Sequence, residues 1–357
     1  MMRKLKFRPC GNFKERYEQE TTIFETDFGR MSVLIGLVVL FFVLPFITSR
    51  YMLYVLNMIG IASIAAVGLN ILIGFTGQIS LGHGAFIGVG AYSAAVLATA
   101  WDFPFFLAVP SAGIITALVG MIFGIPSGRL KGLYLTIATL AGQFIIEYVL
   151  IHWDSVTKGT MGITLPGVTF LGIAIGSDWG FFITIFTILI VMVWVAVNIC
   201  RTKYGRAFIA IRDNDRAAEG MGIPIFRYKL LAFGISSFYA GVAGALLAFY
   251  MVSITTEPFN LGLSVEYIAM VIIGGLGTIS GSIFGAVFIT ILNEVLRFLT
   301  DAFMNMGIFT EIAMNVAPLR EFVFGAAIVL FILFEPRGLA EIWRIVRSNF
   351  RLWPFSY

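Results

Sequence analysis

Charged side chains are scarce in this sequence. Asp, Glu, Lys and Arg make up 12% of the 357 residues, whereas hydrophobic residues make up 59% and the mean hydropathy is +0.93. A water-soluble domain carries about 25% charged residues, which keep its surface hydrated. So few charges cannot cover the surface of a chain of this length. Most of that surface must therefore face a lipid bilayer.

Cysteine and histidine are nearly absent, and so are the motifs of nucleotide and metal chemistry. Cys10 and Cys200 are the only cysteines, and His83 and His152 are the only histidines, so we expect no disulfide and no metal site. No Gly-Lys dipeptide occurs, which excludes a P-loop for ATP phosphates, and no His-Glu-x-x-His motif is present. We therefore expect no catalytic residues and no cofactor in this chain. The energy for any work must come from a partner or from an ion gradient.

Long apolar runs are abundant instead. A helix needs about 20 predominantly apolar residues to cross a bilayer. Ten runs are candidates, although several are short or interrupted by glycine: 31–48, 51–73, 83–100, 104–125, 132–151, 179–199, 228–251, 263–276, 283–299 and 320–334. The sequence predicts an all-α polytopic membrane protein with about ten transmembrane helices, some of them short or interrupted.

Lys and Arg are distributed unevenly among the segments between these runs. With the amino terminus on the cytoplasmic side, nineteen fall in inner segments and three, Arg50, Lys158 and Arg320, fall in outer loops. Positive residues accumulate in the short cytoplasmic loops of membrane proteins. We therefore expect both termini in the cytoplasm. The same asymmetry accounts for the pI of about 9.1 without any nucleic-acid partner.

The composition divides the chain into three parts. Residues 1–30 form a polar, mixed-charge cytoplasmic tail without the short apolar core of a cleavable signal peptide. Residues 31–334 contain all the apolar runs and form the predicted transmembrane domain. Residues 335–357 form a second cytoplasmic tail.

One inner loop, residues 201–227, is longer than a connector between two membrane helices requires. Its order of residues predicts a short helix, because Asn214 and its acidic neighbours suit a helix start, Gly220 suits a helix end and Pro224 prevents continuation.

The predicted short helix carries a small apolar face. Ala217, Ala218 and Met221 fall on one side of it, where small side chains let another surface approach closely. We favour docking of another subunit on this face, with an amphipathic helix lying on membrane lipid as the alternative. The residues expected to form the docking surface are Arg206, Arg212, Asp215, Arg216, Ala217, Ala218, Glu219 and Gly222.

A glycine-containing octet occurs twice. IGFTGQIS at 73–80 and IGGLGTIS at 273–280 share five of eight letters. Interrupted helix is tolerated in a bilayer only where protein or a water-filled cavity surrounds it, and transporters often build their paths from such segments. Close packing of helices through small residues is the alternative explanation for most of the glycines. The candidates for lining a translocation path are Asn70, Gly77, Gln78, Ser80, His83, Gly277 and Ser280.

The ten predicted runs place both octets near the inner side of the membrane and in the same sense. An inverted repeat would require opposite senses. Either the run 83–100 is re-entrant, or the repeat is parallel.

Six longer stretches carry a family resemblance, in the same order along the chain. They are GLNILIGFTGQISLGHGAFIGVGAYSAA (68–95), LKGLYLTIATLA (130–141), TKGTMGI (157–163), YGRAFIAIRDNDRAAEGMGIPIFRYKLLAFGISSFYAGVAGAL (204–246), SVEYIAMVIIGGLGTISGSIFGAVF (264–288) and EPRGLAEIW (335–343). Together they resemble the LivM-type permease subunits of branched-chain amino-acid ABC importers. The tail at 1–30 is not part of the resemblance.

This resemblance implies the ABC importer permease fold, with a cytoplasmic coupling helix in 201–227 that docks an ATPase subunit. It further implies a second homologous permease subunit, two ATPase subunits that bind ATP and Mg, and a periplasmic substrate-binding protein, all at a bacterial inner membrane. The solute would be a branched-chain amino acid, with urea, an amide or another small neutral solute as alternatives. A self-contained secondary transporter is the rival function, and it would need no docking helix.

Overall fold

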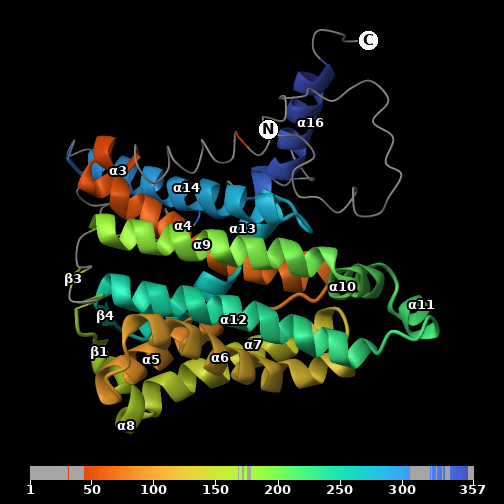
Figure 1. Ribbon diagram of the computed structural model, residues 1–357, viewed down its shortest axis with the longest axis horizontal. Helices are drawn as coiled ribbons and strands as arrows, with labels where there is room; N and C mark the ends of the chain where they lie inside the picture. Colours follow the sequence, from red (N-terminus) through yellow and green to blue (C-terminus); the bar gives the residue numbers. More distant parts are fainter. Residues whose placement is uncertain are drawn as a thin grey trace, which may run out of the picture.

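The computed structural model shows a bundle of long helices that lie side by side (Figure 1). It describes Met31, residues 44–305 apart from 168, 171–172 and 175–177, scattered positions between 322 and 333, and residues 338–352. The longer helices are α4 (Arg50–Asn70), α5 (His83–Ala100), α6 (Phe105–Gly124), α7 (Leu133–His152), α9 (Asp178–Arg201), α10 (Lys203–Asp213), α12 (Ile225–Met251), α13 (Leu261–Gly274), α14 (Ile279–Asn305) and α16 (Leu339–Leu352).

Short elements connect these helices. They are α3 (Leu44–Ile47), the π-helix η2 (Ile71–Phe75), the 3-10 helix η3 (Ile125–Gly128), α8 (Asp154–Thr157), η4 (Gly159–Met161), β1 (Ile163–Thr164), β2 (Thr169–Phe170), β3 (Ile173–Ala174), α11 (Asp215–Gly220), β4 (Ser253–Ile254) and η5 (Glu257–Phe259). Strand β1 pairs antiparallel with β4, and β2 with β3.

Within the described part of the chain, seven helices are long and apolar enough to cross a membrane: α4 with η2, α5, α6 with η3, α7, α9, α12 and α14. Each matches one predicted run. The run at 263–276 forms α13, which has 14 residues and is shorter than a full crossing requires. The tail 1–30 and most of the run 31–48 lie outside the described residues, and the run 320–334 is described only at scattered helical positions. The prediction of an all-α polytopic bundle with some short or interrupted helices is confirmed.

Helices α4 and α12 form the centre of the bundle. Helix α12 packs against α4, α5 and α6. In the most apolar stretch of α4, 89% of the residues are buried, compared with 28% in that of α14. The outer helices expose large apolar side chains, such as Ile114 on α6 and Phe144 on α7. Exposed apolar surface of this extent is typical of a face that contacts lipid.

The bundle has two distinct ends (Figure 1). The α11 end carries α10, α11, the end of α4 and the start of α12. The β1 end carries the β1–β4 pair, the start of α4 and the end of α12. Tyr54, near the start of α4, stacks on Tyr250, near the end of α12, with ring centroids 6.0 Å apart. The two central helices are therefore antiparallel.

Both octets form turns at the α11 end. Helix α4 arrives there and α5 leaves toward the β1 end, where Phe105, at the start of α6, contacts Phe249 near the end of α12. Helix α13 also arrives at the α11 end, and α14 leaves toward the β1 end, where Tyr51 donates a hydrogen bond to Glu294. In both octets the chain therefore arrives from the β1 end and returns toward it. The two octets thus have the same sense, which agrees with a parallel repeat. Helix α5 continues to the β1 end and is not a re-entrant loop.

Two helices begin inside the bundle rather than at its ends. The irregular residues 76–82 lead the chain back beside α4, so that His83 at the start of α5 lies against the Ala65 carbonyl. Helix α13 begins beside the same point, because the Gly84 N–H donates to Ser264 Oγ at 2.7 Å. The two helix starts meet at one depth and run in opposite directions from it.

Glycine allows two helix pairs to touch backbone to backbone. A Cβ atom on Gly90 of α5 would overlap the backbone of Gly241 in α12. A Cβ atom on Gly285 of α14 would overlap the carbonyl oxygen of Met270 in α13. Close packing of helices through small residues, the alternative explanation for most of the glycines, is confirmed for Gly90 and Gly285.

Candidate functional site

The two octet turns are joined by one buried side chain, Asn70, at the end of α4. Its Nδ2 donates to the Thr278 carbonyl at 2.8 Å and to Ser282 Oγ at 2.7 Å, and its Oδ1 accepts from the Gly277 N–H at 3.0 Å. Asn70 has no exposed surface. A buried amide with three such partners fixes the position of both turns. Two segments 200 positions apart in the sequence thus form one contact.

The end of the helix at η2 leaves a backbone acceptor available beside this contact. In a regular α-helix the Gln78 N–H would bond to the Gly74 carbonyl, but here it bonds to the Leu72 carbonyl at 3.1 Å. The free Gly74 oxygen accepts instead from Nη1 of Arg212, at the end of α10, at 2.8 Å. A predicted docking residue therefore binds directly to the first octet.

Arg212 also lies against one glycine with positive φ in each octet. Gly77 has φ 72° and Gly277 has φ 76°. A Cβ on Gly77 would lie 3.1 Å from Arg212 Cγ, and a Cβ on Gly277 would lie 3.1 Å from Arg212 Nη1. Glycine is required here by the backbone conformation and by the space that the arginine occupies. Movement of α10 would act on both octets through this side chain.

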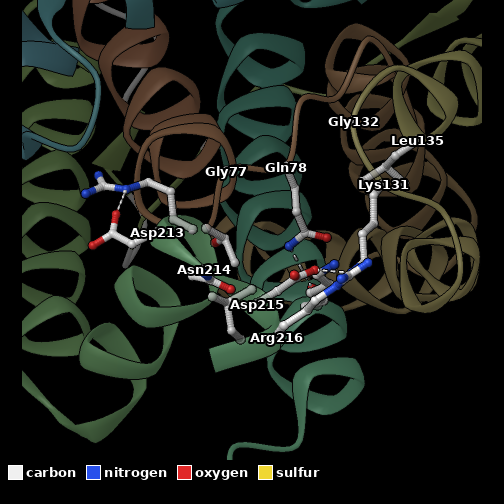
Figure 2. A pocket seen from close by; sticks show the side chains of 13 residues that line it. Gly77, Gln78, Lys131, Gly132, Leu135, Asp213, Asn214, Asp215 and Arg216 are labelled. Atoms are coloured by element: carbon white, nitrogen blue, oxygen red, sulfur yellow. Dashed lines mark hydrogen bonds and ion pairs between the residues drawn. The ribbon is translucent and has the colours of Figure 1, made fainter. Parts of the chain in front are cut away.

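A cavity of about 390 Å³ opens beside this contact (Figure 2). Figure 2 shows that its walls come from the first octet, the start of α7, the hinge between α10 and α11, and the start of α12. Its polar lining includes four basic and two acidic residues. The lining residues are Thr76, Gly77, Gln78, Lys131, Gly132, Leu135, Ile211, Arg212, Asp213, Asn214, Asp215, Arg216 and Lys229.

Two ion pairs lie at the cavity. Lys131 pairs with Asp215, which joins the loop before α7 to the first residue of α11. The hydrogen bond from Lys131 holds the pKa of the Asp215 carboxyl below its ordinary value. Arg212 Nε pairs with Asp213 at 3.1 Å on the exposed side. The α10–α11 hinge is thus held both to the octets and to α7.

Helix α11 begins and ends as the sequence predicts. Asn214 caps it, accepting from the Ala217 N–H at 3.1 Å, and Gly222 follows its end with φ 83°. The predicted apolar face is wrong in one respect, because Ala218 is 3% exposed and faces the chain itself. The Ile223 N–H donates to the Ala218 carbonyl, which closes the last turn of α11.

An exposed surface remains on α11 for contact with another molecule. Met221 is 84% exposed, an unusual value for a large apolar side chain. The predicted docking residues that are exposed are Arg206, Arg212, Arg216, Ala217, Glu219 and Gly222. Asp215 is partly buried by its pair with Lys131.

A second polar cluster lies inside the bundle, where α5 and α13 begin. Gln143 of α7 is its centre: Oε1 accepts from the Ala85 N–H at 2.8 Å and from Ser264 Oγ at 3.0 Å, and Nε2 donates to the Phe259 carbonyl at 2.8 Å. Gln143 has no exposed surface. It satisfies backbone groups at both helix starts, which would otherwise be costly inside a bilayer.

The remaining path candidates occupy different positions. His83 is buried, with Nε2 3.1 Å from the Ala65 carbonyl and its ring edge-on to Tyr267. Ser80 is also buried, and it precedes Leu81, whose N–H donates to Thr139 Oγ1. Ser280 is exposed and lines a separate groove of about 540 Å³ between α9 and α14. Asn70, Gly77, Gln78 and Gly277 are thus brought together, whereas Ser80, His83 and Ser280 are not.

Four residues important to these sites were missed by the sequence analysis. Lys131 and Lys229 complete the cavity, and Gln143 and Ser264 join the two internal helix starts. Lys229 carried a usable signal, since a lysine inside an apolar run generally faces a partner or a cavity. Gln143 gave the same signal, but nothing in the sequence indicated its partners.

The fold and the site together define the class of this protein. Three features are typical of a transport permease: several candidate membrane spans, here seven in the described part of the chain, helices that begin inside the bundle, and a polar α10–α11 hinge in contact with interrupted segments.

The sequence comparisons give the family. Residues 51–332 match the family described as branched-chain amino acid transport system / permease component, and the chain belongs to that family. It is 30% identical over 335 residues to the high-affinity branched-chain amino acid transport system permease protein LivM of Salmonella typhimurium, covering 87% of this chain and 75% of LivM. The predicted resemblance is confirmed. The chain is thus a multi-pass membrane protein.

More distant relatives have other names. The probable branched-chain amino acid transport permease protein LivH of Methanocaldococcus jannaschii is 29% identical over 251 residues, covering 67% of this chain and 78% of LivH. The ribose import permease protein RbsC of Haemophilus influenzae is 26% identical over 263 residues, covering 71% of this chain and 79% of RbsC. No solved structure matches the chain with significance.

Proposed function

We propose that this chain is the permease subunit of an ATP-driven importer, in which it forms half of the translocation path and docks an ATPase subunit through α11. It would use no cofactor of its own. ATP and Mg would be bound by two partner ATPase subunits, and a second, homologous permease would supply the other half of the path.

The observation that carries this proposal is the contact of Arg212 with the Gly74 carbonyl. It connects the exposed α10–α11 hinge to both octet turns without any intervening element. A force applied to α11 by a hydrolysing partner would move Arg212 and would thereby act on the turns between the transmembrane helices. A secondary transporter would have no use for an exposed helix in this position.

The charges favour a cytoplasmic location for the α11 end. The β1 end carries Arg50 and Lys158, whereas the α11 end carries most of the described basic residues. By the positive-inside rule the α11 end lies in the cytoplasm of a bacterial inner membrane, where an ATPase has access to ATP. A periplasmic binding protein would then meet the β1 end, at the segment around β1 and β4.

Branched-chain amino acids are the proposed solutes, since LivM is similar to the chain over most of its length. The ribose permease RbsC shows that permeases of related sequence carry other solutes, so urea, amides and similar small solutes are the alternatives. Uptake of labelled leucine, urea and ribose by cells that express the full importer would separate them.

Docking can be tested with a pair of matched variants. Met221, directly after α11, is 84% exposed and Met161 at the β1 end is 91% exposed. Met221→Glu should abolish co-purification of the ATPase subunits and uptake, while Met161→Glu should retain co-purification. Both variants should insert into the membrane in normal amounts, because neither side chain is buried.

Two results would contradict the proposal. One is unchanged co-purification with Met221→Glu. The other is accumulation of solute by vesicles that contain this chain alone, which would favour a self-contained secondary transporter.

A further inference from the structure

The cavity beside the α10–α11 hinge is lined by a lysine, Lys229, whose ammonium group reaches the cavity and has no hydrogen-bond acceptor among the described residues. Lys229, in the second turn of α12, is 5% exposed and lines the cavity. Among the described residues its ammonium group donates no hydrogen bond, and the carboxylate that acts on it electrostatically is Asp215. Asp215 already pairs with Lys131. An ammonium group in this position requires an anion or water to satisfy its donors.

The other charges of the cavity do not meet this requirement. Arg212 is engaged by the Gly74 carbonyl and by Asp213, which lies on its exposed side. The lining then has four basic against two acidic residues, so that Lys229 and the exposed Arg216 remain in excess. The cavity is therefore positively charged.

Gln78 adds a second unsatisfied group to the same cavity. Its side chain is 3% exposed, and its Oε1 has no hydrogen-bond partner. Its Nε2 lies 3.5 Å from the Lys229 carbonyl, at the outer limit for a hydrogen bond. The cavity thus offers a cation that needs an acceptor and an amide oxygen that needs a donor.

We propose that this cavity is a binding site for a phosphate group, held by Lys229 and Gln78 inside and by Arg216 at the rim. Inorganic phosphate has both kinds of group at neutral pH, since its oxygens accept and its remaining P–OH donates. A carboxylate has acceptors alone and would leave the Gln78 oxygen unsatisfied. A volume of about 390 Å³ is within the range of small-ligand sites.

A phosphate bound here would join three parts of the molecule. Lys229 belongs to α12, Gln78 to the first octet, and Arg216 to α11. Its occupancy would therefore stiffen the connection between α11 and the octet. The inference concerns this chain alone and does not depend on ATPase docking.

Two sources can supply the phosphate. It can be free in the cytoplasm, or it can be the headgroup of an anionic phospholipid, because Lys229 lies at the first turns of a membrane helix, near the level expected for headgroups. Either phosphate can accept from Lys229 and Arg216. A lipid phosphodiester has no P–OH, so a headgroup hydroxyl, such as those of phosphatidylglycerol, would be the donor to the Gln78 oxygen. The test therefore has one arm for each source.

The test measures the thermal stability of the full chain in nanodiscs. In phosphatidylcholine nanodiscs, phosphate at tenfold excess over its Kd should raise Tm by roughly 3 °C. Lys229→Met should weaken binding at least tenfold, whereas Lys203→Met should bind as the original chain does. Lys203 is exposed on α10 and is not part of the cavity, so it controls for the loss of one positive charge.

The second arm replaces phosphatidylcholine by phosphatidylglycerol. A Lys229-dependent rise in Tm in this lipid without added phosphate, with no further rise on adding it, would identify the headgroup as the ligand. Should Lys229→Met not fold, Arg216→Met provides the same test, since that side chain is exposed, and it should weaken binding several-fold. If neither phosphate nor the anionic lipid gives a rise that depends on these residues, the proposal is wrong.

Discussion

Nη1 of Arg212 donates a hydrogen bond of 2.8 Å to the carbonyl oxygen of Gly74, which precedes it by 138 positions. The acceptor is available because the helix ends there: after the left-handed Gly77, the Gln78 N–H bonds to the Leu72 carbonyl rather than to that of Gly74. The donor is in position because α10 ends beside the octets. One irregular turn of helix thus creates the link between the exposed hinge and the interior of the bundle.

Loss of that link should uncouple the hinge from the bundle. Arg212→Ala removes a charged hydrogen bond of about 1.5–3 kcal/mol, so we expect uptake to fall by roughly tenfold or more. Co-purification of the ATPase should persist, because the contact with Gly74 lies on the side of α10 that faces the octets. The measurement is uptake beside pull-down yield, with the exposed Arg129→Ala as control. Normal uptake by Arg212→Ala would show that the contact transmits nothing.

Asn70 should be among the most sensitive positions for stability. Asn70→Ala removes three hydrogen bonds of a buried side chain and leaves the partly buried Gly277 N–H without its partner, whereas the Thr278 carbonyl still accepts from the Ser282 N–H. We expect the free energy of unfolding in detergent to fall by about 2–4 kcal/mol. Thr187→Ala, which removes an exposed hydroxyl bonded within its own helix, should change it by less than about 0.5 kcal/mol. Equal effects of the two substitutions would refute the assigned role.

Gln143 should hold the two internal helix starts together. Gln143→Met keeps the length of the side chain but removes its bonds to Ala85, Ser264 and Phe259. Hydrogen exchange should accelerate by roughly tenfold or more at the starts of α5 and α13, because their backbone groups lose a buried partner. Thr136→Ala, at an exposed position on the same helix, serves as control. Unchanged exchange at α5 and α13 would mean that packing alone positions them.

The pair between Lys131 and Asp215 predicts a pH dependence of the hinge. The pKa of Asp215 is lowered in the folded chain by the hydrogen bond from Lys131, so the ionised carboxyl is favoured by folding. Its contribution is present above the ordinary pKa of 3.8 and is lost as the pH falls through the lower folded value. The effect should be under about 1 kcal/mol, because the pair is partly exposed.

This dependence can be followed by the hydrogen exchange of α11 between pH 5 and the acid limit of the folded chain. After correction for the intrinsic pH dependence of exchange, protection should decrease at the acid end. Asp215→Asn should reduce protection at pH 5 and abolish its further decrease. If Asp215→Asn loses protection with the same pH dependence as the original chain, a group other than Asp215 causes the loss.

Local signals in the sequence predicted the positions and limits of several helices. The run at 228–251 predicted α12 because continuous apolar sequence can only be accommodated by a helix in lipid. Asn214, Gly220 and Pro224 predicted the limits of α11, since capping and proline act within one turn.

The errors and omissions concern direction and partners. Ala218 was expected on the docking face, but it is 3% exposed in the folded chain. Four separate segments line the cavity around Lys229, and nothing in the sequence of any one of them indicates that it lines a cavity. Such features depend on which face of each short helix is covered, and the sequence pattern of a six-residue helix is too short to determine that.

The sequence by itself determined that this chain enters a membrane, where its helices lie and where they break, because those properties depend on the transfer of each segment from water to lipid and on nearby backbone chemistry. Only the tertiary structure decided that the two octets form a single contact through Asn70 and that Arg212 binds it. The physical reason is that a hydrogen bond between segments 138 or 208 positions apart depends on the packing of all the helices between them.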